Sequence, residues 1–146
     1  MDLTTSYPRS VHEKLFGVVQ LARTIDKAQA QAQGTIGEYH YNCPMDQSIF
    51  AFLGIDHEQL LSVAKNASNS SEIEAYAKPF AAKKTAEELE TWNRQYVSHK
   101  PEGDSLKYFL ELRHQVAPDR TDVTTWPDLL DLDEKRAVPN RATTSV

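Results

Sequence analysis

The sequence lacks a second cysteine, long apolar runs and an excess of basic residues, and each of these absences excludes a class of structure or partner. It contains one cysteine, Cys43, which cannot form an internal disulfide and is typical of a reducing compartment. Its longest uninterrupted apolar runs are only a few residues, far below the roughly 20 that span a bilayer, so we expect no membrane partner. Residues 1–5 lack the basic and apolar stretches of a signal peptide, which predicts a cytoplasmic protein.

The sequence also lacks an excess of basic residues. Lys and Arg number 16 against 21 Asp and Glu, which gives a net charge of -5. Residues 1–73 carry 5 basic and 8 acidic groups, and residues 74–146 carry 11 and 13. Because nucleic-acid binding depends on clustered Lys and Arg that neutralise phosphates, we expect no nucleic-acid partner. We interpret the acidic run at 128–134 as the solvent-exposed side of a helix.

What the sequence does contain is a series of helix start and stop signals. Ser10 and Glu13 have the spacing of a capping box, which predicts a helix that can run to Gly34. Pro44 suits the first residue of a second helix and Gly54 its end. Further start signals predict helices after Asp56, Ser71 and Thr85, and Pro79 should end or kink the second of these. Two more helices are predicted, one between Asp104 and Pro118 and one from about Thr125 to Arg136.

These signals predict an all-α fold, a single compact domain of about six or seven short helices. Residues 35–41 could be extended, but one such segment makes no sheet. A chain of 146 residues, 40% of them hydrophobic, can bury a core without disulfides or metal. We expect this domain to span 1–137 and residues 138–146, which lack apolar periodicity, to form a mobile C-terminal tail.

Helical periodicity places two charged residues on apolar helix faces. Asp26 falls on the apolar face of the first predicted helix, and Arg113 falls between Phe109 and Leu110 on a later one. An unpaired charge in an apolar interior costs several kcal/mol, so both must be paired, hydrated or in a cleft. The simplest arrangement pairs them with each other, and Arg23, about one turn before Asp26, is the competing partner. A structural ion pair and a cleft that faces a ligand both fit this pattern.

The densest run of reactive side chains is GEYHYNCPMDQ at residues 37–47. If Pro44 is the first residue of a helix, Cys43 is its N-cap, where free N–H groups and the helix dipole favour a thiolate. Cys43 is therefore a candidate nucleophile. Asp46 would oppose the thiolate and a protonated His40 would support it.

The same segment permits other interpretations. His40 and Cys43 could begin a metal site, completed by Glu38, Asp46 or His57. Alternatively, the segment is a tight loop in which Tyr39 and Tyr41 pack as aromatic anchors, with their hydroxyls hydrogen-bonded at the edge of the core. A third interpretation is a small-molecule site oriented by the carboxylates, His40 and Arg113.

Three parts of the sequence resemble a known family. They are LARTIDKA at 21–28, GTIGEYHYNCPMDQ at 34–47 and the stretch from 126 to 134. Together they are similar to a bacterial family of about this length that is known only as a domain of unknown function. The resemblance covers residue 2 to about 136. It implies a free-standing, soluble bacterial protein and brings no activity, substrate or cofactor with it.

Together these features predict a pocket for a small polar ligand, with the 38–46 segment as its lid. The candidate ligand-binding residues are Arg23, Asp26, Glu38, Tyr39 and Arg113, and the candidate catalytic residues are His40, Cys43 and Asp46. Whether the ligand is also transformed stays open. The alternatives are a non-catalytic interaction or structural protein whose buried ion pair fixes the fold, and a metal-binding protein that uses His40 and Cys43.

Overall fold

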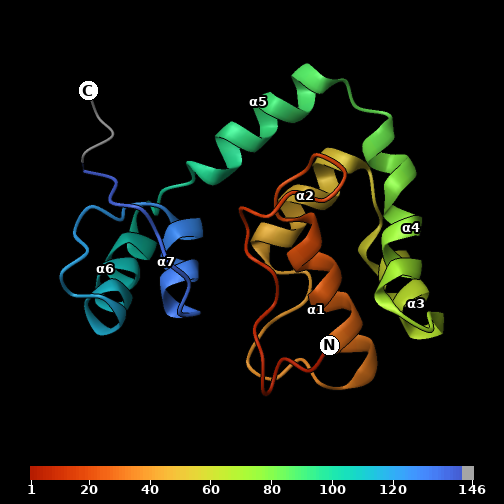
Figure 1. The fold of residues 1–146 in the computed structure, drawn as a ribbon, viewed down its shortest axis with the longest axis horizontal. Helices are drawn as coiled ribbons and strands as arrows, with labels where there is room; N and C mark the ends of the chain where they lie inside the picture. The colour runs from red at the N-terminus through yellow and green to blue at the C-terminus, as the bar shows by residue number, and fades with distance from the viewer. Residues whose placement is uncertain (143–146) are drawn as a thin grey trace. The chain divides into compact units, whose positions relative to one another are not determined.

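A computed structural model describes residues 1–142, and this part of the chain is all-α (Figure 1). Its seven helices are α1 (Leu21–Gln33), α2 (Pro44–Leu53), α3 (His57–Asn66), α4 (Ser70–Ala82), α5 (Ala86–Val97), α6 (Asp104–Val116) and α7 (Trp126–Asp133). Within residues 1–142 the only β-type pairing is an isolated bridge between Leu15 and Val18. The predicted fold class, all-α with six or seven short helices, is confirmed.

Contacts between residues divide the chain into two compact units. Unit 1 is Met1–Asn93, and unit 2 begins at Arg94, so the division falls inside α5. Unit 1 therefore holds α1 to α4 and the first part of α5. Unit 2 holds the end of α5 together with α6 and α7.

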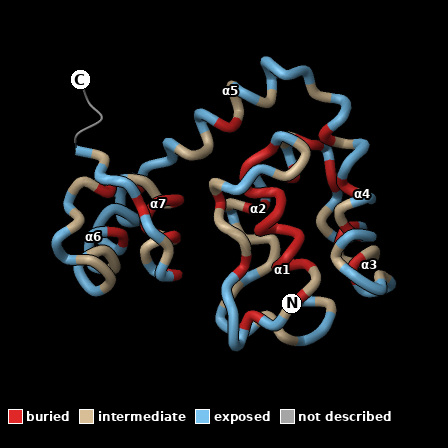
Figure 2. The backbone as a smooth tube through the Cα atoms, in the orientation of Figure 1, coloured by how far each residue is buried: buried red, intermediate tan, exposed pale blue. Residues whose placement is uncertain are grey.

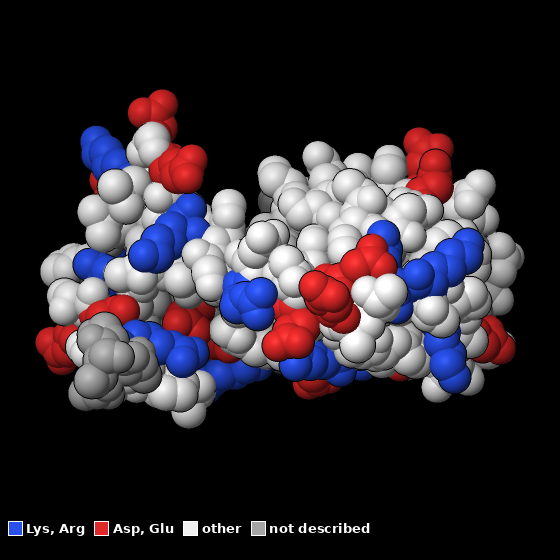
Figure 3. Space-filling model, turned by 90° about the horizontal axis from the view of Figure 1, so that it is seen from above, with Lys and Arg blue, Asp and Glu red and all other residues white. Residues whose placement is uncertain are grey.

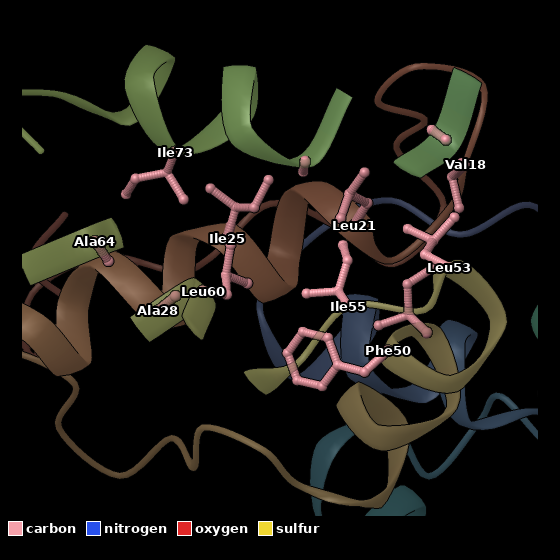
Figure 4. Close-up of a cluster of buried hydrophobic side chains, with 13 residues drawn as sticks. Val18, Leu21, Ile25, Ala28, Phe50, Leu53, Ile55, Leu60, Ala64 and Ile73 are labelled. Atoms are coloured by element: carbon pink, nitrogen blue, oxygen red, sulfur yellow. The ribbon is translucent and has the colours of Figure 1, made fainter. Parts of the chain in front are cut away.

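Helix α1 forms the centre of unit 1. It packs against α3 and α4, and these two helices also pack against each other. Figure 4 shows Ile25 of α1 between Ile73 of α4 and Leu60 of α3. Residues 21–28 of α1 are all buried (Figure 2), and they include the charged residues Arg23, Asp26 and Lys27. Since a helix buried all round is normally apolar all round, the polar residues of α1 need partners inside the protein.

Helix α1 begins at Leu21, so the prediction of a helix over residues 11–20 is wrong. Phe16 has φ 54° and Gln20 has φ 70°, and a right-handed helix cannot continue through a positive φ. The Ser10 hydroxyl accepts a hydrogen bond from the His12 N–H at 3.1 Å and therefore caps only a turn. The predicted end of the helix at Gly34 is correct, with φ 72°.

The predicted boundaries of α2 and the predicted start of α3 are confirmed. Pro44 is the first residue of α2, and Gly54 ends it in the left-handed conformation with φ 78°. Asp56 caps α3, since its Oδ1 accepts from the N–H groups of Glu58 at 2.9 Å and Gln59 at 3.1 Å. The short connection between the two helices therefore follows from local signals.

Helix α4 departs from its prediction at both ends. Its N-cap is Asn69, whose Oδ1 accepts from the Glu72 N–H at 3.2 Å, and the predicted cap Ser71 lies within the helix. The helix also continues through Pro79 to Ala82, so of the expected end or kink at this proline the end is wrong and the kink stays a prediction. Helix α5 starts as predicted, because Thr85 and Glu88 exchange capping hydrogen bonds at 3.0 and 3.1 Å.

Unit 2 is held together by a small core and by ion pairs. The buried cluster that joins α6 to α7 contains Phe109, Val123, Leu129 and Val138. Arg120 binds both carboxylate oxygens of Asp122 at 2.9 Å, and the Arg141 N–H donates to Asp122 at 2.8 Å. These hydrogen bonds connect residues after α7 to the loop before it.

The predicted C-terminal tail is described only in part, since residues 143–146 lie outside the described residues. Val138 is buried, and its carbonyl accepts from Arg120 at 2.9 Å. The Arg141 guanidinium contacts Asp128 at 2.9 and 3.0 Å. The division into 1–137 and 138–146 stays a prediction.

The surface carries charges of both signs. On the face shown in Figure 3, basic and acidic side chains lie next to one another. The acidic run at 128–134 is different, because Asp128, Asp131 and Glu134 are buried, so its interpretation as the solvent-exposed side of a helix is wrong. None of the helices in residues 1–142 has the length and apolar character needed to cross a membrane.

Candidate functional site

A buried group of polar side chains connects α1 to the start of α2. Asp46, the third residue of α2, has no exposed surface. Its Oδ2 lies 2.7 Å from Lys27 Nζ, and its Oδ1 accepts from the Thr24 hydroxyl at 2.7 Å and from Gln20 Nε2 at 3.1 Å. We call Gln20, Thr24, Lys27, Cys43 and Asp46 the Asp46 cluster.

The arrangement of the cluster follows from two local patterns. Gln20, Thr24 and Lys27 are four and three residues apart, which places them on one face of α1. On α2, the Cys43 N–H donates to Asp46 Oδ2 at 3.3 Å, as in a capping box. The capping box at the start of α2 thus fixes the position of the Asp46 carboxylate, which binds the polar side chains on this face of α1.

Cys43 is the half-buried member of the cluster. It is the N-cap of α2, as predicted, and its Sγ lies 3.4 Å from Lys27 Nζ. The Lys27 side chain is only 5% exposed. A single buried ammonium group therefore contacts both a carboxylate and a sulfur atom.

Tyr41 anchors the 37–47 segment to the rest of unit 1. Its hydroxyl donates to the backbone oxygen of His57 at 2.7 Å, and its ring meets Phe50 edge to face at 6.0 Å. Burial, followed by the charges of Asp46 and Asp56, raises the pKa of Tyr41 above its ordinary value. The hydroxyl therefore remains a hydrogen-bond donor, and the predicted role of this tyrosine as an aromatic anchor is confirmed.

Two buried acceptor atoms near the cluster have no hydrogen-bond partner among the described residues. They are Oε1 of Gln20, a residue 1% exposed, and Oδ1 of Asn42. Asn42 directly precedes Cys43 and has φ 62°. A buried acceptor left unsatisfied costs about 1–3 kcal/mol.

Comparison with protein families covers nearly the whole chain. Residues 5–136 match the family described as Domain of unknown function (DUF5069). The chain belongs to this family. The match includes all seven described helices and both acceptor atoms. No curated protein matches the chain.

The DUF5069 chain holds Asp26 by an arginine that the sequence pattern did not suggest. Asp26 is buried, as its helical position predicted, and Arg9 donates hydrogen bonds to both of its carboxylate oxygens. The Arg9 backbone N–H and Nε donate to Asp26 Oδ2 at 2.8 and 3.1 Å, and Nη2 donates to Oδ1 at 3.1 Å. Burial alone would lower the pKa of Arg9, but the hydrogen bond and charge of Asp26, with Glu74 and Glu13, raise it above its ordinary value.

Arg113 belongs to unit 2 and has partners there. It is half-buried, and its Nη1 donates to the backbone oxygens of Val123 at 2.8 Å and Thr121 at 3.3 Å. Asp26 and Arg113 thus each have partners in their own unit. A pocket shared by these two residues stays a prediction.

The remaining predicted ligand-binding residues and the predicted catalytic residue His40 differ in exposure. Glu38 and His40 are exposed, whereas Tyr39 is half-buried. The Arg23 guanidinium lies 5.7 Å from the centre of the Tyr39 ring, and Arg23 is 4% exposed. Arg23 Nη1 also donates to the Arg9 backbone oxygen at 3.2 Å. Arg23 therefore connects the 37–47 segment to the arginine that holds Asp26.

Asp46 is more enclosed than its predicted catalytic role requires. Four donors, from Lys27, Thr24, Gln20 and the Cys43 N–H, occupy its two oxygens. A carboxylate in this setting is suited to position its neighbours. Acid–base roles for Asp46 and His40 stay predictions.

The metal alternative has no matching arrangement. Within residues 1–142, no three His, Cys, Asp or Glu side chains are grouped closely enough to hold a metal ion. His40 and Cys43 therefore have no third ligand in this part of the chain.

A hollow of about 280 Å³ lies elsewhere in unit 1, at the α3–α4 connection, and its lining residues are Ser62, Val63, Asn66, Ala67 and Glu72.

Sequence reasoning found Cys43 and Asp46 but missed their partners on α1. The missed residues are Gln20, Thr24 and Lys27. A signal was present, because polar residues recur there at spacings of four and three in a helix that must be buried on most sides.

Proposed function

We propose that this DUF5069 chain binds a small, hydrogen-bond-donating ligand at the Asp46 cluster and the adjoining 37–47 segment. The observation that carries the proposal is the presence of two buried acceptors without a partner, Oε1 of Gln20 in the cluster and Oδ1 of Asn42, the residue before Cys43. Ligand N–H or O–H groups would satisfy both acceptors and recover the free energy lost when they left water.

The chemistry of the cluster restricts the ligand. Lys27 and Asp46 neutralise each other, so the ligand needs no net charge. Its donor groups would meet Gln20 and Asn42, which favours a compact amide or polyol. We propose that Glu38, Tyr39 and His40, which lie in the same segment, contact the part of the ligand that faces solvent.

Thermal unfolding of the full chain with acetamide, glycinamide or glycerol at millimolar concentration tests the proposal. A ligand that binds the folded state raises the unfolding midpoint. We expect at least one of the three probes to raise it for the natural chain. Asn42→Gly should abolish the rise, because it removes Oδ1 but suits the positive φ of this position.

Asn42→Asp is the matched control. Aspartate keeps an acceptor oxygen and also tolerates the left-handed conformation, so the rise should persist. If no probe raises the midpoint of the natural chain, or if Asn42→Gly retains the rise, the proposal is wrong.

The alternative, a non-catalytic structural or interaction protein, is supported by a different observation. The carboxylates of Asp26 and Asp46 are both fully engaged by side chains and backbone of unit 1. In that case the two ion pairs serve only to fix the fold. Midpoints that none of the probes changes would favour this alternative.

A further inference from the structure

The contact between Lys27 and Cys43 brings together two groups that can react with each other, and the proposed ligand binding does not involve this reaction. Nζ lies 3.4 Å from Sγ, and the lysine side chain is 5% exposed. Lysine is rarely buried to this extent, since its side chain normally extends into water. Here a nitrogen nucleophile is held against an oxidisable sulfur atom.

Asp46 fixes this geometry. Its Oδ2 is 2.7 Å from Lys27 Nζ, and Thr24 and Gln20 hold its other oxygen. The amine therefore stays next to the sulfur without the loss of side-chain freedom that a surface lysine would undergo. The same carboxylate is also positioned to accept a proton from Lys27.

A second observation supports a place at the cluster for a small molecule that donates O–H hydrogen bonds. Gln20 is 1% exposed, and its Oε1 accepts no hydrogen bond from the described residues, although its amide nitrogen binds Asp46. Hydrogen peroxide has two O–H donors and is no larger than two water molecules. It matches this acceptor while Cys43 supplies the group that it oxidises.

We propose that hydrogen peroxide converts the Lys27–Cys43 contact into a covalent sulfenamide crosslink. First, the Cys43 thiol sulfur attacks one peroxide oxygen, the O–O bond breaks, and the S–H proton passes to the departing oxygen to form water. The sulfur loses two electrons to the peroxide and becomes a sulfenic acid.

The second step joins the two side chains. The Lys27 ammonium gives a proton to Asp46, and the free amine attacks the Cys43 sulfur. The S–O bond breaks, and the departing hydroxide takes a second proton from the nitrogen to form another water. The N–S bond thus forms at the cost of one peroxide and with release of two waters. This crosslink does not require the ligand proposed above.

Peptide mapping by mass spectrometry tests the crosslink in the full chain after treatment with a small excess of hydrogen peroxide. The natural chain should yield a joined peptide that contains Lys27 and Cys43, about 2 Da lighter than the two separate peptides. A thiol reductant should reverse it. Mapping also separates this product from oxidation at Met1 and Met45.

Lys27→Arg isolates the amine. Arginine keeps the positive charge beside Asp46 but stays protonated and cannot attack sulfur. This variant should give a sulfenic acid at Cys43, trapped by dimedone, without a joined peptide. Lys14→Arg, at an exposed lysine, should leave the crosslink unchanged.

Several results would overturn the inference. They are a natural chain in which Cys43 stops at the sulfenic acid, one in which Cys43 only forms an intermolecular disulfide, and a joined peptide that persists in Lys27→Arg.

Discussion

At the scale of single residues, Lys27 and Asp46 each depend on the other to neutralise a buried charge. Both side chains are at least nine-tenths buried, so neither charge can be solvated by water if its partner is removed. Removing one member of a buried ion pair typically costs about 3–5 kcal/mol, although the net contribution of the pair is much smaller. The cluster is therefore a sensitive point of unit 1 whether or not it binds a ligand.

Lys27→Met tests this dependence. We expect the free energy of unfolding to fall by about 3–5 kcal/mol, because methionine fills a similar volume but leaves the Asp46 carboxylate unpaired. Urea denaturation of the purified chain measures the change. Adding Asp46→Asn should restore part of the loss, and strictly additive losses in the double variant would show that the two residues are not coupled.

At the scale of elements, the glycines at 34 and 37 differ in what surrounds them. Both have positive φ, 72° and 62°. A Cβ at Gly34 would meet nothing within 4 Å, whereas one at Gly37 would lie 3.0 Å from the Leu3 backbone oxygen. The N-terminal segment therefore packs directly on the turn that leads into the 37–47 segment.

Alanine substitutions distinguish the two positions. Gly34→Ala should lower the free energy of unfolding by about 1 kcal/mol, which is the cost of a left-handed alanine alone. Gly37→Ala should cost roughly 2–3 kcal/mol, because the backbone at Leu3 must also move. Equal losses, measured by urea denaturation, would contradict this explanation.

Pro79 is an exposed proline inside α4, where it removes a backbone donor. Pro79→Ala should raise the free energy of unfolding by about 1–3 kcal/mol, since alanine restores the helical hydrogen bond and relieves the clash with the preceding turn. Thermal and urea unfolding both measure this change. An unchanged or lower stability would show that the proline fits α4 without strain.

Helix ends were predictable where the signal lies within a few residues. The caps of α2, α3 and α5 depend on pairs such as Asp56 and Gln59, three residues apart. The start of α1 was not, because the turn before it is held by Asn93. Asn93 accepts from the Val19 N–H at 3.1 Å and donates to the Gly17 oxygen at 2.8 Å, across more than 70 residues. A local cap at Ser10 cannot reveal such a contact.

The candidate site shows the same division. Periodicity correctly placed Asp26 inside the protein, because burial of a helix face is a property of the helix itself. Its partner Arg9 lies in an irregular segment whose path depends on tertiary packing. Cys43 and Asp46 were found because a capping box is local, whereas Lys27 required knowledge of which face of α1 meets α2.

At the scale of the whole molecule, carboxylates paired with arginine connect stability to pH. In unit 2, the hydrogen bond from Arg120, with that from the Arg141 N–H, lowers the pKa of Asp122 below its ordinary value. A carboxyl whose pKa is lower in the folded state stabilises the fold above its unfolded pKa. That stabilisation is lost as pH falls through the folded value.

Asp122→Asn tests this linkage. The natural chain should lose stability as pH falls from about 5 toward 2, and the variant should lose less over the same window because it lacks the titrating group. Urea denaturation at a series of pH values gives both curves. Parallel curves for the two proteins would show that Asp122 does not contribute.

The most direct test of the ligand proposal is a series of two-dimensional ¹H–¹⁵N NMR spectra of the full chain titrated in turn with acetamide, glycinamide and glycerol. The account predicts that at least one of them causes progressive, saturable shifts for the backbone amides of residues 42, 43, 45 and 46 and for the side-chain amides of Gln20 and Asn42. A spectrum that none of them changes, or shifts confined to the hollow at residues 62–72, would contradict it.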